Sequence, residues 1–253
     1  MSEREQSDSM PMPRRAMLLA AGLGTRLRPL TDAVSKCMIQ IAGKPLLEHN
    51  VEALRSYGVT DLVINLHHLP HTVMDHFGNG GGLGVRIEYS VEPELLGTAG
   101  AVKKAERFFD GPFFVWYGDN LSTCRLDRLW RFHHTRRAAA TIALYYRDDP
   151  TRSGIVGLDE HDRVVRFLEK PRPDQVFSHW VNAGILVLER QAIEAIPAGS
   201  AADFGRDIFP AMLESDSPIF GYRMTEDENL SWIDAPEDLA RVEQELGAQV
   251  RHE

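Results

Sequence analysis

Short apolar runs separated by helical patterns dominate the first 145 residues, and this alternation restricts the fold more than any other feature. The runs lie at residues 16–20, 62–66, 85–89 and 113–117. The first and last are continuously apolar, as expected for strands that helices cover on both faces. Between the first two, Pro45 opens an amphipathic helical pattern that Gly58 is positioned to end. The alternation predicts an α/β fold with a central, mostly parallel sheet flanked by helices.

The pattern changes from residue 139 onward. Strand-like pieces at 141–146, 155–158, 164–168 and 183–188 are joined by turn-rich segments, and helical patterns follow at 204–213 and 236–246. We therefore expect a smaller, more antiparallel, β-rich part in the second half. The chain reads as a disordered tail over residues 1–14 followed by one domain over 15–253, with halves at 15–138 and 139–253.

Composition excludes several classes of partner. With 28 basic against 37 acidic residues, the net charge is −9, which argues against nucleic acid or an anionic membrane as a partner. No run of about 18 apolar residues exists, and the first 15 residues lack the apolar stretch of a signal peptide, so a cytoplasmic protein is expected. The 2 cysteines lack CxxC spacing, which argues against a thiolate zinc site.

A glycine-rich, basic segment follows the first apolar run directly. Gly22, Gly24 and Thr25 come next to Arg26, and Lys36 follows ten positions after that arginine. Ligands bind beyond the carboxyl ends of the strands in such sheets, and glycines let backbone N–H groups approach a phosphate. The third glycine of GxGxxG is absent, as is the GxxxxGK[ST] pattern, so a dinucleotide fingerprint and a P-loop are both excluded. The segment predicts a polyphosphate site of another kind.

These residues resemble the signature of the sugar-1-phosphate nucleotidylyltransferases, GxGTR followed by a proline–lysine pair. Further motifs recur in the family's order from about residue 15 onward: AGKPLLEH, LLGTAG, YGDN, FLEKP, VNAGILVL and WIDAPEDL. The resemblance is nearest to the guanylyltransferases that act on mannose- or heptose-type sugar phosphates. One departure is Ser35, which stands where the family usually has proline before the lysine. It removes some rigidity from the loop that carries Lys36.

The resemblance implies a Rossmann-like nucleotidyltransferase fold, with a nucleotide-binding first half and a sugar-phosphate-binding second half. It implies Arg26, Lys36, Asp119 and Asp234 as catalytic residues, with the two aspartates holding Mg²⁺. Mg²⁺ prefers one or two carboxylates completed by substrate phosphates and water, so the residue types suit the role. On local features alone, Asp119 equally reads as a turn residue and Asp234 as a helix cap.

The remaining site residues also come from matched motif positions. For the nucleotide these are Leu19, Ala21, Gly22, Gly24, Thr25, Glu92, Gly97 and Thr98. For the sugar phosphate they are Gly154, Glu169, Lys170, Val181, Asn182 and Trp232. Val181 and Trp232 equally suit a core. Glu92 stands where the thymidylyltransferases carry glutamine, and an acceptor-only carboxylate suits the two neighbouring donors of guanine. This favours GTP weakly, since some uridylyltransferases also carry an acid there.

The implied reaction is nucleotidylyl transfer from a nucleoside triphosphate to a sugar-1-phosphate, giving a nucleotide sugar and pyrophosphate. Thymidylyl- or uridylyltransferase activity remains an alternative. So does a non-catalytic protein that binds nucleotide sugars as a regulator, although the joint presence of the charged residues argues against it. The expected partners are the two small-molecule substrates, and homo-oligomerisation is left open.

Overall fold

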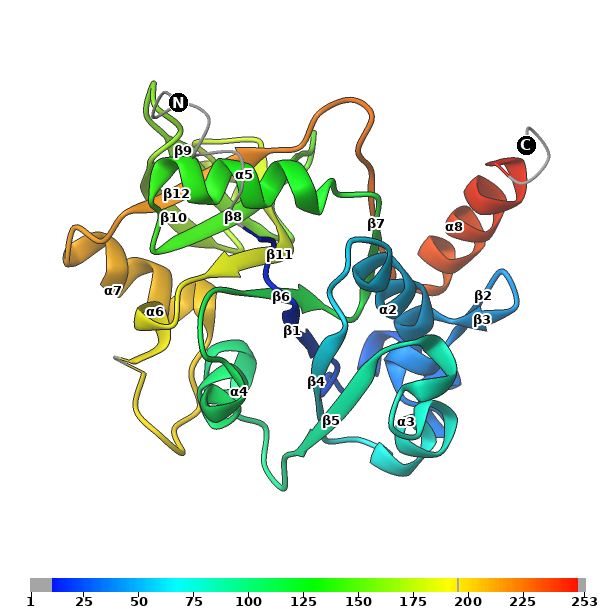
Figure 1. Ribbon diagram of the computed structural model, residues 1–253. Coiled ribbons are helices and arrows are strands. Elements are labelled where there is room, and N and C mark those ends of the chain that lie inside the picture. The colour runs from blue at the N-terminus through cyan, green and yellow to red at the C-terminus, as the bar shows by residue number, and fades with distance from the viewer. Residues whose placement is uncertain (1–10, 195, 250–253) are drawn as a thin grey trace, which may run out of the picture.

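A sheet of 9 strands organises the computed structural model, which describes residues 11–194 and 196–249 (Figure 1). Its strands are β1 (Arg15–Leu19), β4 (Asp61–Leu66), β5 (Arg86–Val91), β6 (Phe113–Tyr117), β8 (Ala140–Tyr146), β9 (Gly154–Leu158), β10 (Val164–Glu169), β11 (Trp180–Leu188) and β12 (Ile219–Arg223). The main path runs β10-β9-β11-β6-β1-β4-β5, and β8 joins it through β11, with β12 beyond. The predicted tail falls largely on residues 1–10, which lie outside the described residues.

Strand directions divide the sheet into two parts. The strands β6, β1, β4 and β5 are all parallel, as the first-half pattern predicts. Beyond them β11 pairs antiparallel with β6, β8 and β9, and β10 pairs antiparallel with β9, whereas β12 is parallel to β8. The α/β fold with a mostly parallel centre is confirmed, and so is the more antiparallel second half, whose strands extend the same sheet.

Helices cover both faces of this sheet (Figure 1). They are α2 (Leu46–Ser56), α3 (Pro70–Phe77), α4 (Gly97–Lys104), α5 (Leu126–Arg136), α6 (Gln191–Glu194), α7 (Phe209–Glu214) and α8 (Pro236–Gln249). The helical pattern predicted at 204–213 is confirmed, and its first part is a π-helical turn, Phe204–Ile208, that leads directly into α7. Pro210 has no N–H to donate to the carbonyl four residues earlier, which explains why a regular helix does not run through this point.

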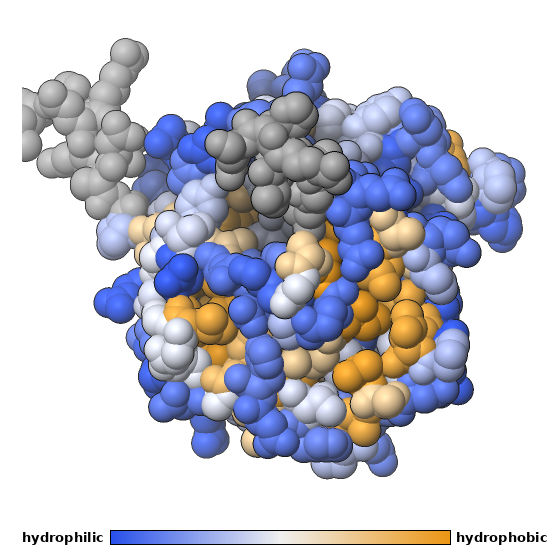
Figure 2. Space-filling model, turned by 90° about the vertical axis from the view of Figure 1, so that its right-hand side faces the viewer, coloured by the Kyte–Doolittle hydropathy of each residue, from blue (hydrophilic) through white to orange (hydrophobic). Residues whose placement is uncertain are grey.

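The core explains why the first apolar run has no polar position. Along β1, Ala16 and Leu18 belong to one buried cluster, and Met17 belongs to another. Successive strand side chains point to opposite faces, so both faces of β1 are covered and both need apolar residues. The exterior is mixed, and hydrophilic side chains surround smaller apolar areas on the side viewed in Figure 2.

A short ribbon connects segments that are far apart in the sequence. Strand β7 (Asn120–Ser122) directly follows Asp119 and pairs antiparallel with β13 (Leu230–Trp232), which ends two residues before Asp234. The backbone N–H of Ile233 also donates to the carbonyl of Asp119 at 3.3 Å. This ribbon brings an acid from each half of the chain to the same end of the sheet.

Candidate active site

The glycine-rich loop is tightly folded at its second glycine. Gly24 adopts a left-handed backbone with φ of 62°, and a Cβ there would lie 2.8 Å from Thr31 Cγ2 and 3.0 Å from Lys36 Cβ. Both the positive φ and this close approach require glycine. A Cβ on Gly22, by contrast, would meet no atom within 4 Å. Gly22 therefore leaves open the space in front of the loop.

Ser35 holds Lys36 in the geometry that proline would impose. Its φ of −60° lies within the narrow range fixed by a proline ring, and it precedes a short 3₁₀ turn, Lys36–Met38. The Ser35 side chain is buried against Cys37, with Oγ and Sγ 3.4 Å apart. The buried surroundings thus supply locally the constraint that the missing ring would give.

Lys36 joins the two halves of the site. Its ammonium Nζ donates to Asp119 Oδ2 at 2.8 Å and to Asp234 Oδ1 at 2.9 Å. The guanidinium of Arg26 lies 2.9 Å from the same Asp234 oxygen. The four residues implied as catalytic therefore form one cluster, although they span more than 200 positions of sequence.

Burial strengthens the interactions between the charges of this cluster. The Lys36 side chain is only 9% exposed, against 42% for Asp119 and 21% for Asp234. Burial by itself lowers the pKa of Lys36, but the two carboxylates outweigh it, and the net result is a raised pKa. Burial likewise favours a higher pKa for Asp234, and the charge of Lys36 overcomes it, so that pKa is lowered. Lys36 and Asp234 therefore stay charged at neutral pH.

The two aspartates suit a hard divalent cation. Both carboxylates already converge on one cationic group, and they supply the oxygen donors that such ions prefer. Over residues 11–194 and 196–249, no three histidine, cysteine or acidic side chains gather in a metal-binding arrangement. A metal held here would need further ligands from a substrate.

Two clefts meet at Lys36 and Asp119. The first has a volume of about 230 Å³, and the second, of about 190 Å³, lies over the glycine-rich loop and the acids. Both are lined by Gly22, Lys36 and Asp119. All the residues expected at the nucleotide line one or the other: Leu19, Ala21, Gly22, Glu92, Gly97 and Thr98 the first, and Gly22, Gly24 and Thr25 the second.

Glu92 lies in the wall of the first cleft but is anchored by the protein itself. It is 2% exposed, Oε1 accepts from Asn65 Nδ2 at 2.8 Å, and Oε2 accepts from the backbone N–H of Leu96 at 3.1 Å. Asn65 Oδ1 in turn accepts from the N–H of Ala20 at 2.8 Å. The buried Asn65 thus ties the glycine-rich loop to the Glu92 loop. Recognition of the nucleotide base by Glu92 stays a prediction.

The start of α4 packs against the second half of the chain. Gly97 has a φ of 71°, and a Cβ there would lie 2.4 Å from the carbonyl oxygen of Ala202. Thr98 donates to Asp203 Oδ2 at 2.9 Å, and Asp203 Oδ1 accepts from the N–H of Gly205 at 2.9 Å. Asp203 also lines the first cleft. Asp203 therefore links the start of α4, which is expected to bind the nucleotide, to the π-helical turn.

Among the expected sugar-side residues, Gly154 and Glu169 lie together, because they are paired across β9 and β10. A Cβ on Gly154 would come within 2.6 Å of Glu169 Oε2, so the glycine makes room for the carboxylate. Burial, followed by the nearby charge of Asp203, raises the pKa of Glu169. Lys170 has a left-handed backbone with φ of 49°, and its Nζ lies 3.9 Å from Glu169 Oε1.

The other three expected sugar-side residues are placed differently from one another. Val181 is fully buried and pairs with Tyr145 on one side and Ile155 on the other, so its side chain belongs to the core. Asn182 Oδ1 accepts from the N–H of Gly184 at 2.9 Å where β11 changes register. Trp232 lies in β13, 5.9 Å from the ring of Tyr145. None of the six expected sugar-side residues lines either cleft.

Sequence reasoning missed Asn65, Asp203 and Arg152. Asn65 gave a signal, because it is an amide within the otherwise apolar end of β4. Asp203 gave one also, because an aspartate before a helical pattern often caps it. Arg152, from the loop before β9, lies close enough to help lower the pKa of Asp234. Because Arg152 stands in a loop, no sequence pattern marked it as a residue of the site.

Comparison with known proteins identifies the family. A family model described as "Nucleotidyl transferase" matches residues 15–246. Mannose-1-phosphate guanylyltransferase from Mycobacterium tuberculosis is 38% identical over 238 residues, which cover 91% of this chain and 64% of that protein. UTP–glucose-1-phosphate uridylyltransferase from Synechocystis is 35% identical over 234 residues, covering 87% of this chain and 59% of that protein. The chain thus spans less than two thirds of the length of either relative.

Solved structures support the fold. A putative glucose-1-phosphate thymidylyltransferase from Bacillus anthracis superposes with a TM-score of 0.81 at 22% identity, covering 91% of this chain and 94% of that one. HddC from Yersinia pseudotuberculosis gives 0.78 at 24% identity, covering 92% and 99%. Among the described residues, no helix is long and apolar enough to cross a bilayer. The chain belongs to the nucleotidyl transferase family, as a member of the sugar-1-phosphate nucleotidylyltransferases that its sequence motifs predict.

Proposed function

We propose that this protein transfers a nucleotidyl group from a nucleoside triphosphate, GTP in preference, to a mannose- or heptose-like sugar-1-phosphate. The products are a nucleotide sugar and pyrophosphate. The observation that carries the proposal is the contact of Lys36 with Asp119 and Asp234, at 2.8 and 2.9 Å, where two clefts meet. A site that only bound a nucleotide would not need acids and cations from both halves of the chain at one point.

The chemistry asks little of the protein beyond position and charge. An oxygen of the sugar-1-phosphate attacks the α-phosphorus, a new P–O bond forms, and the bond to the β-phosphate oxygen breaks as pyrophosphate leaves. The attacking oxygen is already ionised at neutral pH, so no general base is required. Arg26 and Lys36 lie where they can neutralise phosphate oxygens, and Gly22 leaves room for those oxygens at the loop.

A divalent cation, Mg²⁺ in our proposal, would be held by Asp119 and Asp234 together with substrate phosphates. When bound, it would neutralise charge on the triphosphate and orient it. Lys36 lies between these acids, so we expect it to hold them together before the substrate arrives and to turn toward a phosphate afterwards.

The choice of substrates rests on two weaker observations. The relative from Mycobacterium tuberculosis is named for mannose-1-phosphate and guanylyl transfer, which supports GTP and a mannose-like sugar. Glu92 offers an acceptor-only side chain in the wall of the first cleft, which suits guanine. The relative from Synechocystis is named for UTP and glucose-1-phosphate, so uridylyl transfer is the second candidate.

The test is pyrophosphate release from the purified chain with Mg²⁺. GTP, UTP, dTTP and ATP are each combined with mannose-, glucose-, heptose- and N-acetylglucosamine-1-phosphate. We expect the fastest release with GTP and a mannose- or heptose-type substrate, and none when EDTA removes the metal. Fastest release with UTP or dTTP would correct the base. Tight binding of a nucleotide sugar, with no release from any pair, would instead support a regulatory binding protein.

A further inference from the structure

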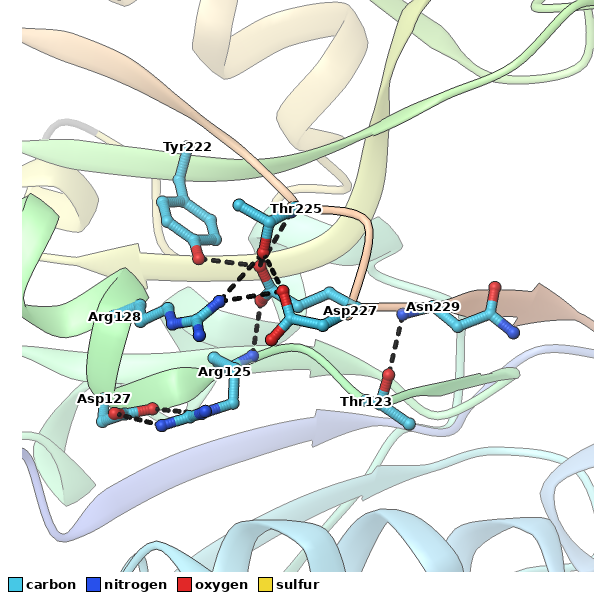
Figure 3. A network of polar contacts seen from close by, with 9 residues as sticks. Thr123, Arg125, Asp127, Arg128, Tyr222, Thr225, Asp227 and Asn229 are labelled. Atoms are coloured by element: carbon cyan, nitrogen blue, oxygen red, sulfur yellow. Dashed lines mark hydrogen bonds and ion pairs between the residues drawn. The ribbon is translucent and has the colours of Figure 1, made fainter. Parts of the chain in front are cut away.

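Figure 3 shows a second polar cluster. It lies at the end of the β7–β13 ribbon where Ser122 pairs with Leu230, and the acids adjoin the opposite end, where Asn120 pairs with Trp232. Its centre is Glu228, which is 4% exposed and not labelled in the figure. Glu228 Oε1 accepts from the backbone N–H of Arg125 at 2.6 Å. Oε2 accepts from the Tyr222 hydroxyl at 2.8 Å and from the N–H of Thr225 at 2.9 Å. One buried carboxylate therefore connects the end of β12, the loop before β13 and the start of α5.

Thr123 and Asn229 complete this connection. The N–H of Asn229 donates to Thr123 Oγ1 at 2.7 Å, and the N–H of Thr123 donates to the carbonyl of Asn229 at 3.0 Å. The hydroxyl of Ser122 donates to the same carbonyl at 2.8 Å. We call Thr123, Glu228 and Asn229 the clasp. It joins the segment that leaves β7 to the segment that enters β13.

The ribbon between the clasp and the acids is very short. It consists of 3 residue pairs, from Ser122–Leu230 to Asn120–Trp232. Two-stranded ribbons are marginally stable alone, and a slip of one residue turns every side chain to the opposite face. Because Asp119 and Asp234 adjoin opposite strands of this ribbon, its register decides how far apart their carboxylates lie.

The two ends of the ribbon differ in what substrate binding would do to them. At the acid end, Lys36 holds the carboxylates together, and its ammonium is the group that we expect to turn toward a phosphate. At the other end, no residue of the clasp lines either of the two clefts that meet at Lys36. The clasp can therefore keep its contacts while those of Lys36 change.

We propose that Glu228 is a positioning residue that, with Thr123, holds the β7–β13 ribbon in register and so sets the separation of the Asp119 and Asp234 carboxylates. The inference rests on the proposed function only in taking those acids as the metal ligands. Glu228 itself does not touch substrate, and its effect on the site passes through the ribbon.

Two substitutions weaken the clasp. Glu228→Gln replaces one acceptor oxygen by an NH₂ group that must face a donor, and Thr123→Ala removes the acceptor of the Asn229 N–H. We expect each to lower the affinity for Mn²⁺ with GTP present about tenfold, and to speed amide hydrogen exchange in peptides covering 119–124 and 229–234. Free Mn²⁺ is measured by its paramagnetic resonance, and exchange by mass spectrometry. Thr123→Ser keeps the acceptor and should restore both readouts.

Asp227→Asn is the matched control. Asp227 is an exposed acid one residue from Glu228, paired with Arg128 at 3.0 Å. Asp227 also accepts from the Thr225 hydroxyl at 2.5 Å, and asparagine keeps an oxygen that can accept there. Because Asp227 makes none of the Glu228 contacts with Arg125, Tyr222 and the Thr225 N–H, Mn²⁺ affinity and ribbon exchange should stay at wild-type values. A fall in thermal stability without a change in either readout would show Glu228 to be merely structural.

The remaining outcomes are also decisive. Faster ribbon exchange with wild-type Mn²⁺ affinity in both clasp variants would refute the link to the acids. If Glu228→Gln does not fold, the comparison of Thr123→Ala with Thr123→Ser, at an exposed position, tests the role of the clasp by itself. Wild-type protein that binds no Mn²⁺ would refute the metal in the proposed function, and unchanged ribbon exchange in the variants would separately refute the clasp.

Discussion

The proposed phosphate end of the site and its proposed sugar side differ in how firmly the protein holds the lysine of each. Lys36 is 9% exposed and donates to two carboxylates within 2.9 Å. Lys170, the lysine expected at the sugar phosphate, is 57% exposed and has one carboxylate 3.9 Å away. The Lys36 ammonium is buried in two short ion pairs, whereas the Lys170 ammonium is mostly exposed to solvent and has one longer ion pair.

This difference suggests a division of labour. A buried cation already held at the cleft needs only to turn toward the bound phosphate, and once there it costs no further reorganisation when charge develops in the transition state, so it contributes most to the rate. A mobile surface cation contributes mainly to binding, because its ordering opposes the Coulomb attraction that it gains. We expect damage at Lys36 to appear chiefly in kcat, and damage at Lys170 chiefly in KM for the sugar phosphate.

Replacing Lys36 should have the largest effect. Lys36→Met keeps the buried stem but removes the charge between Asp119 and Asp234, and we expect kcat for pyrophosphate release to fall roughly a hundredfold or more. Lys44→Met removes a surface ammonium that pairs with Glu52 at 2.7 Å and serves as the control. Near-normal turnover in Lys36→Met would mean that this lysine only holds the acids together and does not act on the reacting phosphate.

Replacing Lys170 should have a smaller effect of a different kind. We expect Lys170→Ala to raise KM for the sugar-1-phosphate about tenfold, the cost of one charge-assisted hydrogen bond, with KM for the nucleotide unchanged. Steady-state kinetics with each substrate varied in turn measure this. Arg172→Ala, which removes an exposed neighbouring charge, should change neither constant. A fall confined to kcat would contradict the division between the two lysines.

The same contrast explains what the sequence could predict. The glycine-rich loop at the proposed phosphate end could be recognised because it follows an apolar strand directly, whereas Asp119 and Asp234 were assigned through the resemblance to the family's motifs. Their motifs predicted that Asp119 and Asp234 converge, and in the structure both contact Lys36. The ribbon of 3 residue pairs that brings them together was not indicated by any periodicity in the sequence. The anchoring of Glu92 by Asn65 and the Leu96 N–H depends on tertiary contacts, and local pattern carries no information on these. The clasp at Glu228 could not be predicted for the same reason, because its contacts join segments that are far apart in the sequence.

Glu92 tests whether the preorganised end also reads the base. Glu92→Gln keeps the shape but presents an NH₂ group to Asn65, to the Leu96 N–H or to the nucleotide. We expect the preference for GTP over UTP, expressed as a ratio of kcat/KM values, to fall about tenfold. Glu94→Gln changes an exposed acid of the same loop and should leave the ratio unaltered. An unchanged ratio in Glu92→Gln would reduce Glu92 to a support for the loop.

Glu169 should give the smallest effect, and one that appears in stability. Burial, and then the charge of Asp203, raises the pKa of Glu169 above its value in the unfolded chain. The folded state therefore holds this proton more tightly, and stability is lost as pH rises from the unfolded pKa, near 4.3, through the raised one. Above the raised pKa the wild-type chain carries this cost, and Glu169→Gln removes it.

We accordingly expect Glu169→Gln to raise Tm at pH 7 by about 1–3 °C, with the difference vanishing toward pH 4. Glu160→Gln, at a highly exposed acid of the β9–β10 turn, should show no difference at either pH. A carboxylate kept at a cost to stability on the loosely organised side would indicate that sugar recognition, and not folding, maintains it. A lower Tm for Glu169→Gln at pH 7 would show instead that the carboxylate stabilises β10, and both sides of the site would then be preorganised.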